Sequence, residues 1–142
     1  MDEQMFSENS ATEEGLGQMH TAAVCAGFPS PADDYLEGAL DLNRLLVKNA
    51  PATFFLRVKG DSMTGAGIHM DDILVVDRSV APAHNSIVVA VFNGALTVKR
   101  LWKKNGQLFL MPDNPTYRPI DVTYMEDFQV WGVATSVIHS LR

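Results

Sequence analysis

The sequence predicts a mainly β fold: a small antiparallel β domain with short helices near its front and a flexible N-terminal arm. Three observations predict this fold. After residue 52, six segments are rich in Val, Ile, Phe, Leu and Thr, which favour strands. Asn-Gly pairs separate apolar segments at residues 93–94 and 105–106, and this is a strong hairpin signal. Residues 1–26 are polar and lack a sustained apolar period.

The predicted strands follow one another through short connections. Their expected bounds are Thr53–Val58, Asp72–Asp77, Ser86–Phe92, Ala95–Trp102, Gln107–Met111 and Phe128–Ser136. Because the two Asn-Gly pairs join three of these segments in succession, residues 86–111 are predicted to form a three-stranded antiparallel meander. The length of 142 residues also favours one domain.

Two short helices are expected before the strands. The first starts at Ser30 and ends at Gly38, because serine can cap a helix and the proline that follows it suits the first helical position. Residues 41–48 predict the second helix, which Asn49 and Pro51 end. Three leucines lie on one face of this second helix, at positions 42, 45 and 46.

Negative charge is concentrated at the N-terminus. Residues 1–26 hold five carboxylate side chains and no Lys or Arg, so residues 27–142 account for only −1 of the formal net charge of −6. We expect residues 1–26 to be a flexible acidic arm and residues 27–142 to be the folded domain. Neither part offers the basic face that binds duplex DNA. Direct specific DNA binding is therefore not expected, and any link to nucleic acid should run through a protein partner.

Composition also indicates the compartment. Cys25 is the sole cysteine, so no internal disulfide can form, as is usual in a reducing cytoplasm. No apolar run approaches the ~18 residues of a membrane span, and the N-terminus has neither region of a signal peptide. We therefore expect a cytoplasmic protein without a membrane anchor. We expect no cofactor and no metal, since the spacing of His69, Asp71 and Asp72 matches no ligand pattern and suits a solvated turn.

Ser62 and Lys99 are the candidate chemical groups. Ser62 lies on a predicted turn after a strand, and Lys99 lies within an apolar strand 37 residues later. A serine hydroxyl needs a neighbouring base to become a good nucleophile. Lysine can serve only when neutral, and at its reference pKa roughly one lysine in 2,500 is neutral at pH 7. Desolvation lowers a lysine pKa, so a buried Lys99 could act as the general base of Ser62.

The strand pattern around Lys99 supports burial. Lys99 and Arg100 are adjacent, so they point to opposite faces of the strand, and at least one of them shares a face with mostly apolar neighbours. Lysine loses its proton readily and arginine does not, so Lys99 is the residue that could be a base. With spacing alone as evidence, the favoured interpretation is that Ser62 is a turn serine and Lys99 an exposed strand lysine.

Residues beside the pair complete a candidate hydrolase site. Gly60 would relieve crowding where a substrate backbone approaches. The backbone N–H groups of Asp61 and Ser62 are the expected oxyanion donors. The bond between Ala26 and Gly27 joins small residues in the flexible region and is the candidate substrate, so that enzyme and substrate are one polypeptide. Cys25 could be a second nucleophile, but no histidine constellation accompanies it, and a small residue beside the cut is the simpler interpretation.

Five motifs in order resemble the UmuD group of the LexA-like self-cleaving serine peptidases, the S24 family. The resemblance extends over nearly the whole chain after the arm, including the spacing from serine to lysine. The motifs cover residues 26–35 (AGFPSPADDY), 41–46 (DLNRLL), 60–63 (GDSM), 71–77 (DDILVVD) and 96–101 (LTVKRL).

This resemblance implies a fold, a reaction and partners. The fold would be the LexA/UmuD C-terminal, signal-peptidase-like β domain. Ser62 would be the nucleophile and Lys99 the general base of an autoproteolytic serine endopeptidase that cuts between Ala26 and Gly27. A RecA filament on single-stranded DNA would stimulate the cut. The processed homodimer, residues 27–142, would act with a UmuC-like Y-family DNA polymerase in translesion synthesis and mutagenesis during the SOS response to DNA damage.

The chain departs from this family in two places. UmuD proteins of enteric bacteria cut a Cys-Gly bond, whereas here Ala26 stands between Cys25 and Gly27. LexA and some plasmid-borne relatives use Ala-Gly, so Ala26–Gly27 is the predicted bond. Relatives also commonly have Gly-Asp after the histidine at position 84, where this chain has Asn85 and Ser86.

Other functions compete with self-cleavage. A non-catalytic dimeric module that binds a polymerase or RecA would keep the two residues as a relic. A repressor-type C-terminal domain is a third candidate, but the first 26 residues are too few and too polar for a helix-turn-helix. A signal peptidase shares Ser-Lys chemistry, but it requires a membrane anchor, which the sequence does not predict.

Overall fold

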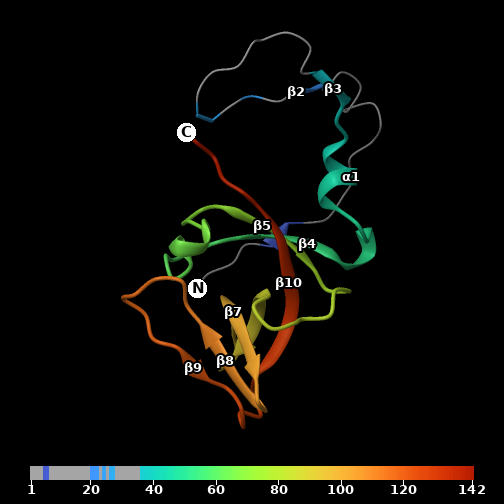
Figure 1. The fold of residues 1–142 in the computed structure, drawn as a ribbon. Helices are drawn as coiled ribbons and strands as arrows, with labels where there is room; N and C mark the ends of the chain where they lie inside the picture. Colours follow the sequence, from blue (N-terminus) through green and yellow to red (C-terminus); the bar gives the residue numbers. More distant parts are fainter. Residues whose placement is uncertain (1–4, 7–19, 23, 25, 28–35) are drawn as a thin grey trace. The chain divides into compact units, whose positions relative to one another are not determined.

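The computed structural model describes residues 5–6, 20–22, 24, 26–27 and 36–142 (Figure 1). Contacts divide the chain into two compact units. Unit 1 combines Met1–Glu8 with Asn49–Arg142, and unit 2 is Asn9–Lys48. The predicted division after residue 26 marks a cleavage site, whereas these units are defined by contacts within the fold. The predicted division therefore stays a prediction.

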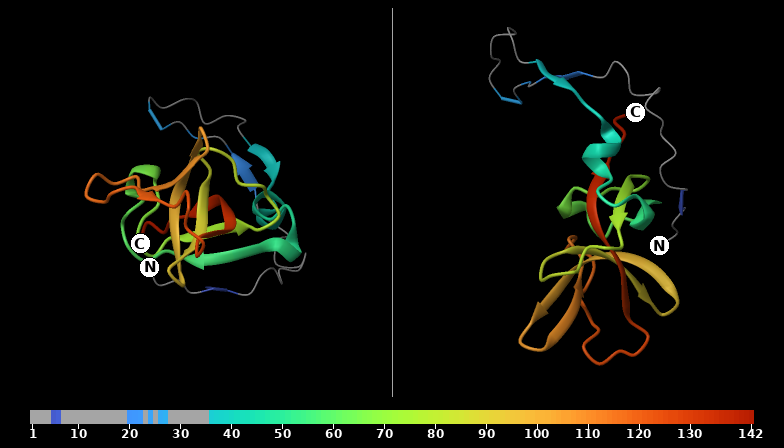
Figure 2. Two further views of the ribbon diagram at one scale, coloured as in Figure 1. Left: turned by 90° about the horizontal axis from the view of Figure 1, so that it is seen from below. Right: turned by 90° about the vertical axis from the view of Figure 1, so that its right-hand side faces the viewer.

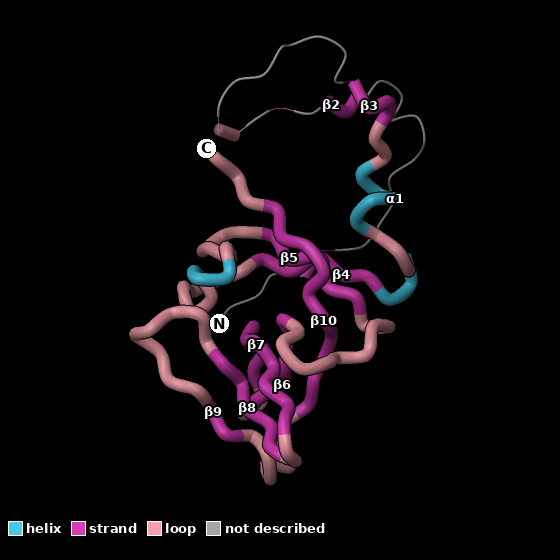
Figure 3. Tube along the Cα trace, viewed as in Figure 1, coloured by secondary structure: helices cyan, strands magenta, loops and turns pink. Residues whose placement is uncertain are grey.

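Unit 1 is built on one antiparallel sheet, so the predicted mainly β fold is confirmed. Strands are the main regular structure of this unit, and its helical segments are single short turns (Figure 3). Along the sheet the strands lie in the order β1-β4-β5-β10-β6-β7-β8-β9. Their bounds are Met5–Phe6 (β1), Thr53–Arg57 (β4), Ile73–Asp77 (β5), Ile87–Phe92 (β6), Ala95–Lys104 (β7), Gln107–Met111 (β8), Ile120–Asp121 (β9) and Gln129–Ile138 (β10).

The predicted meander is confirmed as β6, β7 and β8. Both Asn-Gly pairs lie at the hairpin tips, and all four residues have positive φ, between 52° and 76°. Asn and Gly tolerate that conformation best, and two successive positive φ values match the twist of the flanking strands. The register that results places Val88 opposite Lys99 and Met111 opposite Arg100.

Strand β10 joins the two halves of the sheet. Its first half pairs with β6 and its second half with β5, and the register shifts between Val130 and Gly132 and again between Ala134 and Ser136. In Figures 1 and 2 it is the long red strand that changes direction as it passes between these partners. Gly132 permits close packing here, since a Cβ atom at this position would lie 2.6 Å from Val76 Cγ1.

Two apolar clusters form the core of unit 1, and the first of them flanks the residues of interest. It contains Met63 and Val98, which are 1% and 2% exposed and are the chain neighbours of Ser62 and Lys99. Its other buried members are Leu56, Val58, Ile68, Leu74, Val76 and Val89. The second cluster consists of Val88, Ala90, Leu101, Leu110, Val122 and Val133.

Among the described residues, one of the two predicted helices is present, and it is shorter than predicted. Helix α1 spans Leu42–Leu46 and is capped by the carboxylate of Asp41, which confirms the second predicted helix. The first prediction is wrong over its last residues, because Leu36–Ala39 form strand β3 and pair with β2, His20–Ala22. Glycine weakens a helix, and in β3 the backbone around Gly38 forms strand hydrogen bonds with β2 instead of helical ones. Residues 30–35 of that prediction lie outside the described residues.

Short strands also occur where the sequence pattern predicted none. β1 and β2 both fall within residues 1–26, and β1 pairs with β4 at one end of the sheet. Single-turn 3-10 helices, Ala50–Ala52 and Thr64–Ala66, lie before β4 and after Met63. The second of these follows Ser62 closely and closes the turn on which that serine lies.

Candidate active site

A small cleft of about 140 Å³ in unit 1 contains both predicted residues. Its walls come from the segment after β4, from β7 and from the loop after β8. The lining residues are Lys59, Gly60, Asp61, Ser62, Thr97, Lys99 and Tyr117. The structure therefore brings Ser62 and Lys99 together across the 37 residues that separate them in the sequence.

Local backbone geometry presents Ser62 to the cleft. Gly60 has φ +99°, a left-handed conformation that glycine adopts without strain. A Cβ atom added at Gly60 would meet nothing within 4 Å, so the space beside this residue is open. The next residue after Ser62, Met63, is inserted in the core. The turn is therefore anchored on one side by a buried side chain, while Ser62 itself stays half-buried at the surface.

The amine of Lys99 contacts the hydroxyl of Ser62. Lys99 Nζ donates to Ser62 Oγ at 2.9 Å, to Thr97 Oγ1 at 3.0 Å and to the Val98 carbonyl at 3.2 Å. These three acceptors match the three N–H bonds of a charged ammonium group. In a neutral amine two N–H bonds remain for Thr97 and Val98, and the lone pair can accept the Ser62 hydroxyl proton over the same distance.

Burial favours the neutral form of Lys99. The residue is 9% exposed, and its partner across the β6–β7 ladder, Val88, is fully buried. Leu101 shares its strand face and is 2% exposed. Desolvation by these surroundings lowers the pKa of Lys99 from its ordinary value. The candidate base is thus buried, as the sequence predicted. The pKa of Lys99 shifts downward, which is the direction that general-base chemistry requires.

The loop after β8 holds the backbone of the nucleophile turn. The Asp113 N–H donates to the Ser62 carbonyl at 2.9 Å, and Asn114 Nδ2 donates to the Asp61 carbonyl at 2.8 Å. The Tyr117 hydroxyl donates to Asp61 Oδ1 at 2.5 Å, and this contact raises the pKa of Tyr117. Both carbonyls are therefore engaged with this loop. The role of the Asp61 and Ser62 N–H groups as oxyanion donors stays a prediction.

Sequence reasoning missed most of the residues that hold the pair in place. Thr97 had a usable signal, since it lies two residues before Lys99 on a strand and must share its face. Asn114 and Tyr117 had none, because they belong to a loop more than 50 residues from Asp61 in the sequence. Their contacts with Asp61 depend on the path of a loop that has no regular secondary structure.

The predicted scissile bond lies outside the unit that forms the cleft. Ala26 and Gly27 are exposed and form a bend in unit 2. Their role as the bond that is cut stays a prediction. Cys25, considered above as a second nucleophile, lies outside the described residues.

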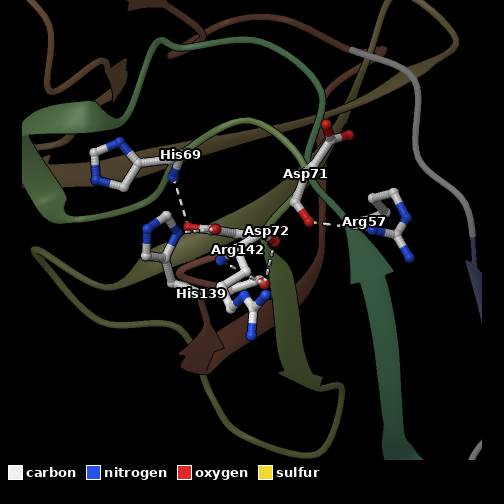
Figure 4. Close-up of polar contacts among 7 residues, drawn as sticks. Arg57, His69, Asp71, Asp72, His139 and Arg142 are labelled. Carbon is white, nitrogen blue, oxygen red and sulfur yellow. Dashed lines mark hydrogen bonds and ion pairs between the residues drawn. The ribbon is translucent and has the colours of Figure 1, made fainter.

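Acidic residues near Ser62 in sequence have structural partners. Asp72 is 2% exposed, accepts a hydrogen bond from the His69 N–H at 2.7 Å, and contacts His139 Nδ1 at 2.5 Å (Figure 4). Asp71 pairs with Lys59 at 2.5 Å, and that hydrogen bond lowers the pKa of Asp71. The contact between Asp72 and His139 connects the β4–β5 turn to the end of β10. Both carboxylates are therefore engaged in interactions within the fold. Within the described part of the chain, no group of three His, Cys, Asp or Glu residues could hold a metal ion.

The departure at Asn85 has a conformational explanation. Asn85 has φ +72°, in the region where glycine is favoured and asparagine is tolerated. Its carbonyl accepts a hydrogen bond from Arg100 NH1 at 3.0 Å, and its N–H donates to the Leu101 carbonyl at 2.7 Å. Asparagine can therefore adopt the backbone conformation that this loop requires.

None of the helices in the part of the chain that the structure describes has the length and hydropathy of a transmembrane span.

Comparisons with known proteins agree with the geometry. The sequence pattern of the family described as Peptidase S24-like matches residues 18–135. Protein SamA of Salmonella typhimurium is 46% identical over 124 residues, which cover 87% of this chain and 86% of SamA. Protein ImpA of Escherichia coli is 47% identical over 118 residues, 82% of this chain and 79% of ImpA.

A third relative covers almost the entire chain. Protein MucA of Escherichia coli is 40% identical over 141 residues, 96% of this chain and 92% of MucA. The matches thus extend from the N-terminal segment to the end of the sheet. The chain therefore belongs to the Peptidase S24-like family, as its UmuD-like motifs predict.

Proposed function

We propose that this protein is a self-cleaving serine peptidase in which Ser62 attacks the Ala26–Gly27 bond and Lys99 is the general base. The observation that carries the proposal is the 2.9 Å contact between Lys99 Nζ and Ser62 Oγ, made by a lysine that is 9% exposed. Membership in a peptidase family supports the reaction class.

In the first step, neutral Lys99 takes the proton of Ser62 Oγ as the oxygen attacks the Ala26 carbonyl carbon. Negative charge develops on the Ala26 oxygen, and the N–H groups of Asp61 and Ser62 are proposed to stabilise it. The tetrahedral intermediate collapses as the bond to Gly27 breaks. Lys99 returns its proton to the Gly27 nitrogen, which leaves as the new N-terminus.

In the second step, water attacks the ester between Ser62 and Ala26. Lys99 accepts a proton from this water, and Ser62 Oγ takes a proton back as the arm is released. Residues 1–26 carry five carboxylates and no Lys or Arg, so cleavage leaves a body that is nearly neutral. A change of that size in charge alters which surfaces of a protein attract partners.

We further propose that a RecA filament on single-stranded DNA stimulates the cut. The processed chain, residues 27–142, would then act as a homodimer with a UmuC-like Y-family DNA polymerase in SOS translesion synthesis and mutagenesis. Support for this role comes from the similarity to UmuD-like relatives over most of the chain.

Intact mass spectrometry tests the proposal. The purified chain is incubated with and without RecA, single-stranded DNA and a nucleotide, and separately at alkaline pH, beside a Ser62→Ala control. A fragment that begins at Gly27, absent from the control, is the expected result.

Other outcomes would redirect the proposal. A chain that stays intact in every condition would favour the non-catalytic dimeric module that binds a polymerase or RecA. A fragment that persists in the Ser62→Ala control would identify a contaminating protease and not self-cleavage.

A further inference from the structure

We propose that the ion pair between Arg100 and Asp113 positions Ser62 Oγ against Lys99 Nζ, so that these two residues are positioning residues of the proposed reaction. This inference rests on the proposed function, since it assigns a cause to the geometry of the same serine. Neither residue lines the cleft.

Asp113 holds the nucleophile turn through its backbone. Its N–H donates to the Ser62 carbonyl at 2.9 Å, and its own carbonyl accepts the Gly65 N–H at 2.7 Å. Asp113 therefore bonds both ends of the four-residue turn, residues 62–65. The fit is close, because a Cβ atom at Gly65 would lie 2.6 Å from the Asp113 oxygen.

Arg100 holds Asp113 through its side chain. Its Nε and NH2 groups donate to Asp113 Oδ2 at 3.2 and 2.7 Å, and its NH1 group donates to the Asn85 carbonyl at 3.0 Å. The two side chains are 31% and 28% exposed, so water screens the pair only in part. The sheet explains why they meet: Arg100 is opposite Met111 in the ladder, and Asp113 follows two residues later.

One dipeptide on β7 thus fixes Ser62 from two directions. Lys99 contacts the serine side chain from one face of the strand. Arg100, on the opposite face, holds the loop residue that bonds the serine backbone. A displacement of about 1 Å can reduce an enzymatic rate about 100-fold, so a small shift of this turn should be visible in the reaction.

Two readouts separate the nucleophile from the docking of the arm. The first is the first-order rate of self-cleavage of the full chain. The second is the rate at which a small fluorophosphonate labels Ser62, followed by intact mass. In that labelling, Ser62 Oγ forms a bond to phosphorus, fluoride leaves with the bonding electrons, and Lys99 takes the hydroxyl proton.

The variants are Arg100→Gln, Asp113→Asn and the charge-exchanged double variant Arg100→Asp with Asp113→Arg. We expect both single variants to slow cleavage and labelling by about 10- to 100-fold. The double variant should recover part of that loss. Arg118→Gln, which removes an exposed arginine in the same loop, is the matched control and should retain the wild-type rates. Thermal unfolding identifies any variant that fails to fold. If a single variant fails to fold, the rates of the double variant decide whether the ion pair positions Ser62.

The pH profile distinguishes positioning from a charge effect on Lys99. If the pair positions Ser62, both single variants lower the high-pH plateau and leave the midpoint of the rise unchanged. If instead these charges act on the pKa of Lys99, the two variants shift the midpoint in opposite directions, which would overturn the inference. Wild-type rates in both single variants would also overturn it. A wild-type chain that neither cleaves nor reacts would overturn the proposed function itself.

Discussion

The two residues of the candidate dyad are held by different kinds of structure. Lys99 lies on β7, a ten-residue strand that is paired on both sides and flanked by the buried Val98. Ser62 lies on a turn whose regular structure is a single 3-10 segment. Individual hydrogen bonds from the loop after β8 hold that turn.

This difference predicts which substitutions should reduce activity more than they reduce the stability of the fold. Changes on β7 act on a strand that many ladder bonds and core contacts support, so its position should be robust. Changes in the turn or in the loop after β8 remove one of a few bonds, and the geometry of Ser62 should shift before the fold is lost.

Lys99→Met should have the largest effect. It keeps the length of the side chain and removes the base, so self-cleavage should fall about 1,000-fold or more. Intact mass over time measures the loss. Lys103→Met, at an exposed position on the same strand, is the control and should cleave normally. Cleavage of the Lys99→Met chain at a wild-type rate would assign the base to another residue.

The comparison of Lys99→Met with the wild-type chain also gives a prediction for stability. Because burial lowers the pKa of Lys99, the folded state binds fewer protons than the unfolded state between the lowered pKa and the ordinary one. The cost of burying the lysine is therefore full below the lowered pKa and is relieved as pH rises toward the ordinary value. Lys99→Met removes this cost, so its advantage in free energy of unfolding should shrink with rising pH. Urea denaturation at several pH values measures it, and an advantage that grows with pH would contradict the account.

Gly65→Ala should have the next largest effect. The new Cβ atom would lie 2.6 Å from the Asp113 oxygen, a backbone atom that cannot swing away. Separation of the turn from the loop should reduce cleavage about 100-fold and destabilise the fold by about 1–3 kcal/mol.

The matched control is Gly106→Ala at the β7–β8 hairpin tip. Gly106 has φ +74° and open space around it, so its substitution strains the backbone without a clash. It should cost stability and leave cleavage unchanged. Equal cleavage rates in the two glycine variants would show that the turn does not depend on its contact with Asp113.

Thr97→Val should have a moderate effect. It keeps a β-branched residue on the strand and removes the hydroxyl that accepts from Lys99 Nζ at 3.0 Å. Without that acceptor the amine is less well oriented, and cleavage should slow about 10-fold. Thr135→Val on β10, whose hydroxyl donates to the Val75 carbonyl, is the control and should cleave as the wild type does. An effect of equal size in both threonine variants would mean that the loss reflects packing alone.

Tyr117→Phe should have the smallest effect. It removes the hydroxyl that donates to Asp61, while the Asn114 and Asp113 bonds to the turn remain. Because the tyrosine is 44% exposed, we expect a two- to threefold decrease in cleavage rate and a small change in stability. A loss as large as that of Gly65→Ala would place the tyrosine among the residues that the reaction requires.

The two regions also differ in how far the sequence predicted them. The meander and Lys99 were predictable because Asn-Gly turns and strand alternation are local signals, read within a few residues. The place of Ser62 was predictable only as a turn. Its contacts with Asp113, Asn114 and Tyr117 depend on a loop some 50 residues away, and no local pattern encodes that approach. The same limit explains Leu36–Ala39, where pairing with β2 replaced a predicted helix.

An NMR titration of the lysine side chains, with ¹³C at Cε, in the uncleaved Ser62→Ala chain shows whether Lys99 can be neutral and act as a base. That substitution is expected to keep the chain intact at alkaline pH, and Lys99→Met in the same background assigns the Lys99 signal. We expect Lys99 to lose its proton at a pH below the ordinary range of a lysine side chain, because burial lowers its pKa. A Lys99 signal that titrates in the ordinary range of a lysine side chain would contradict the assignment of Lys99 as the base, since a fully charged amine cannot accept the proton of Ser62.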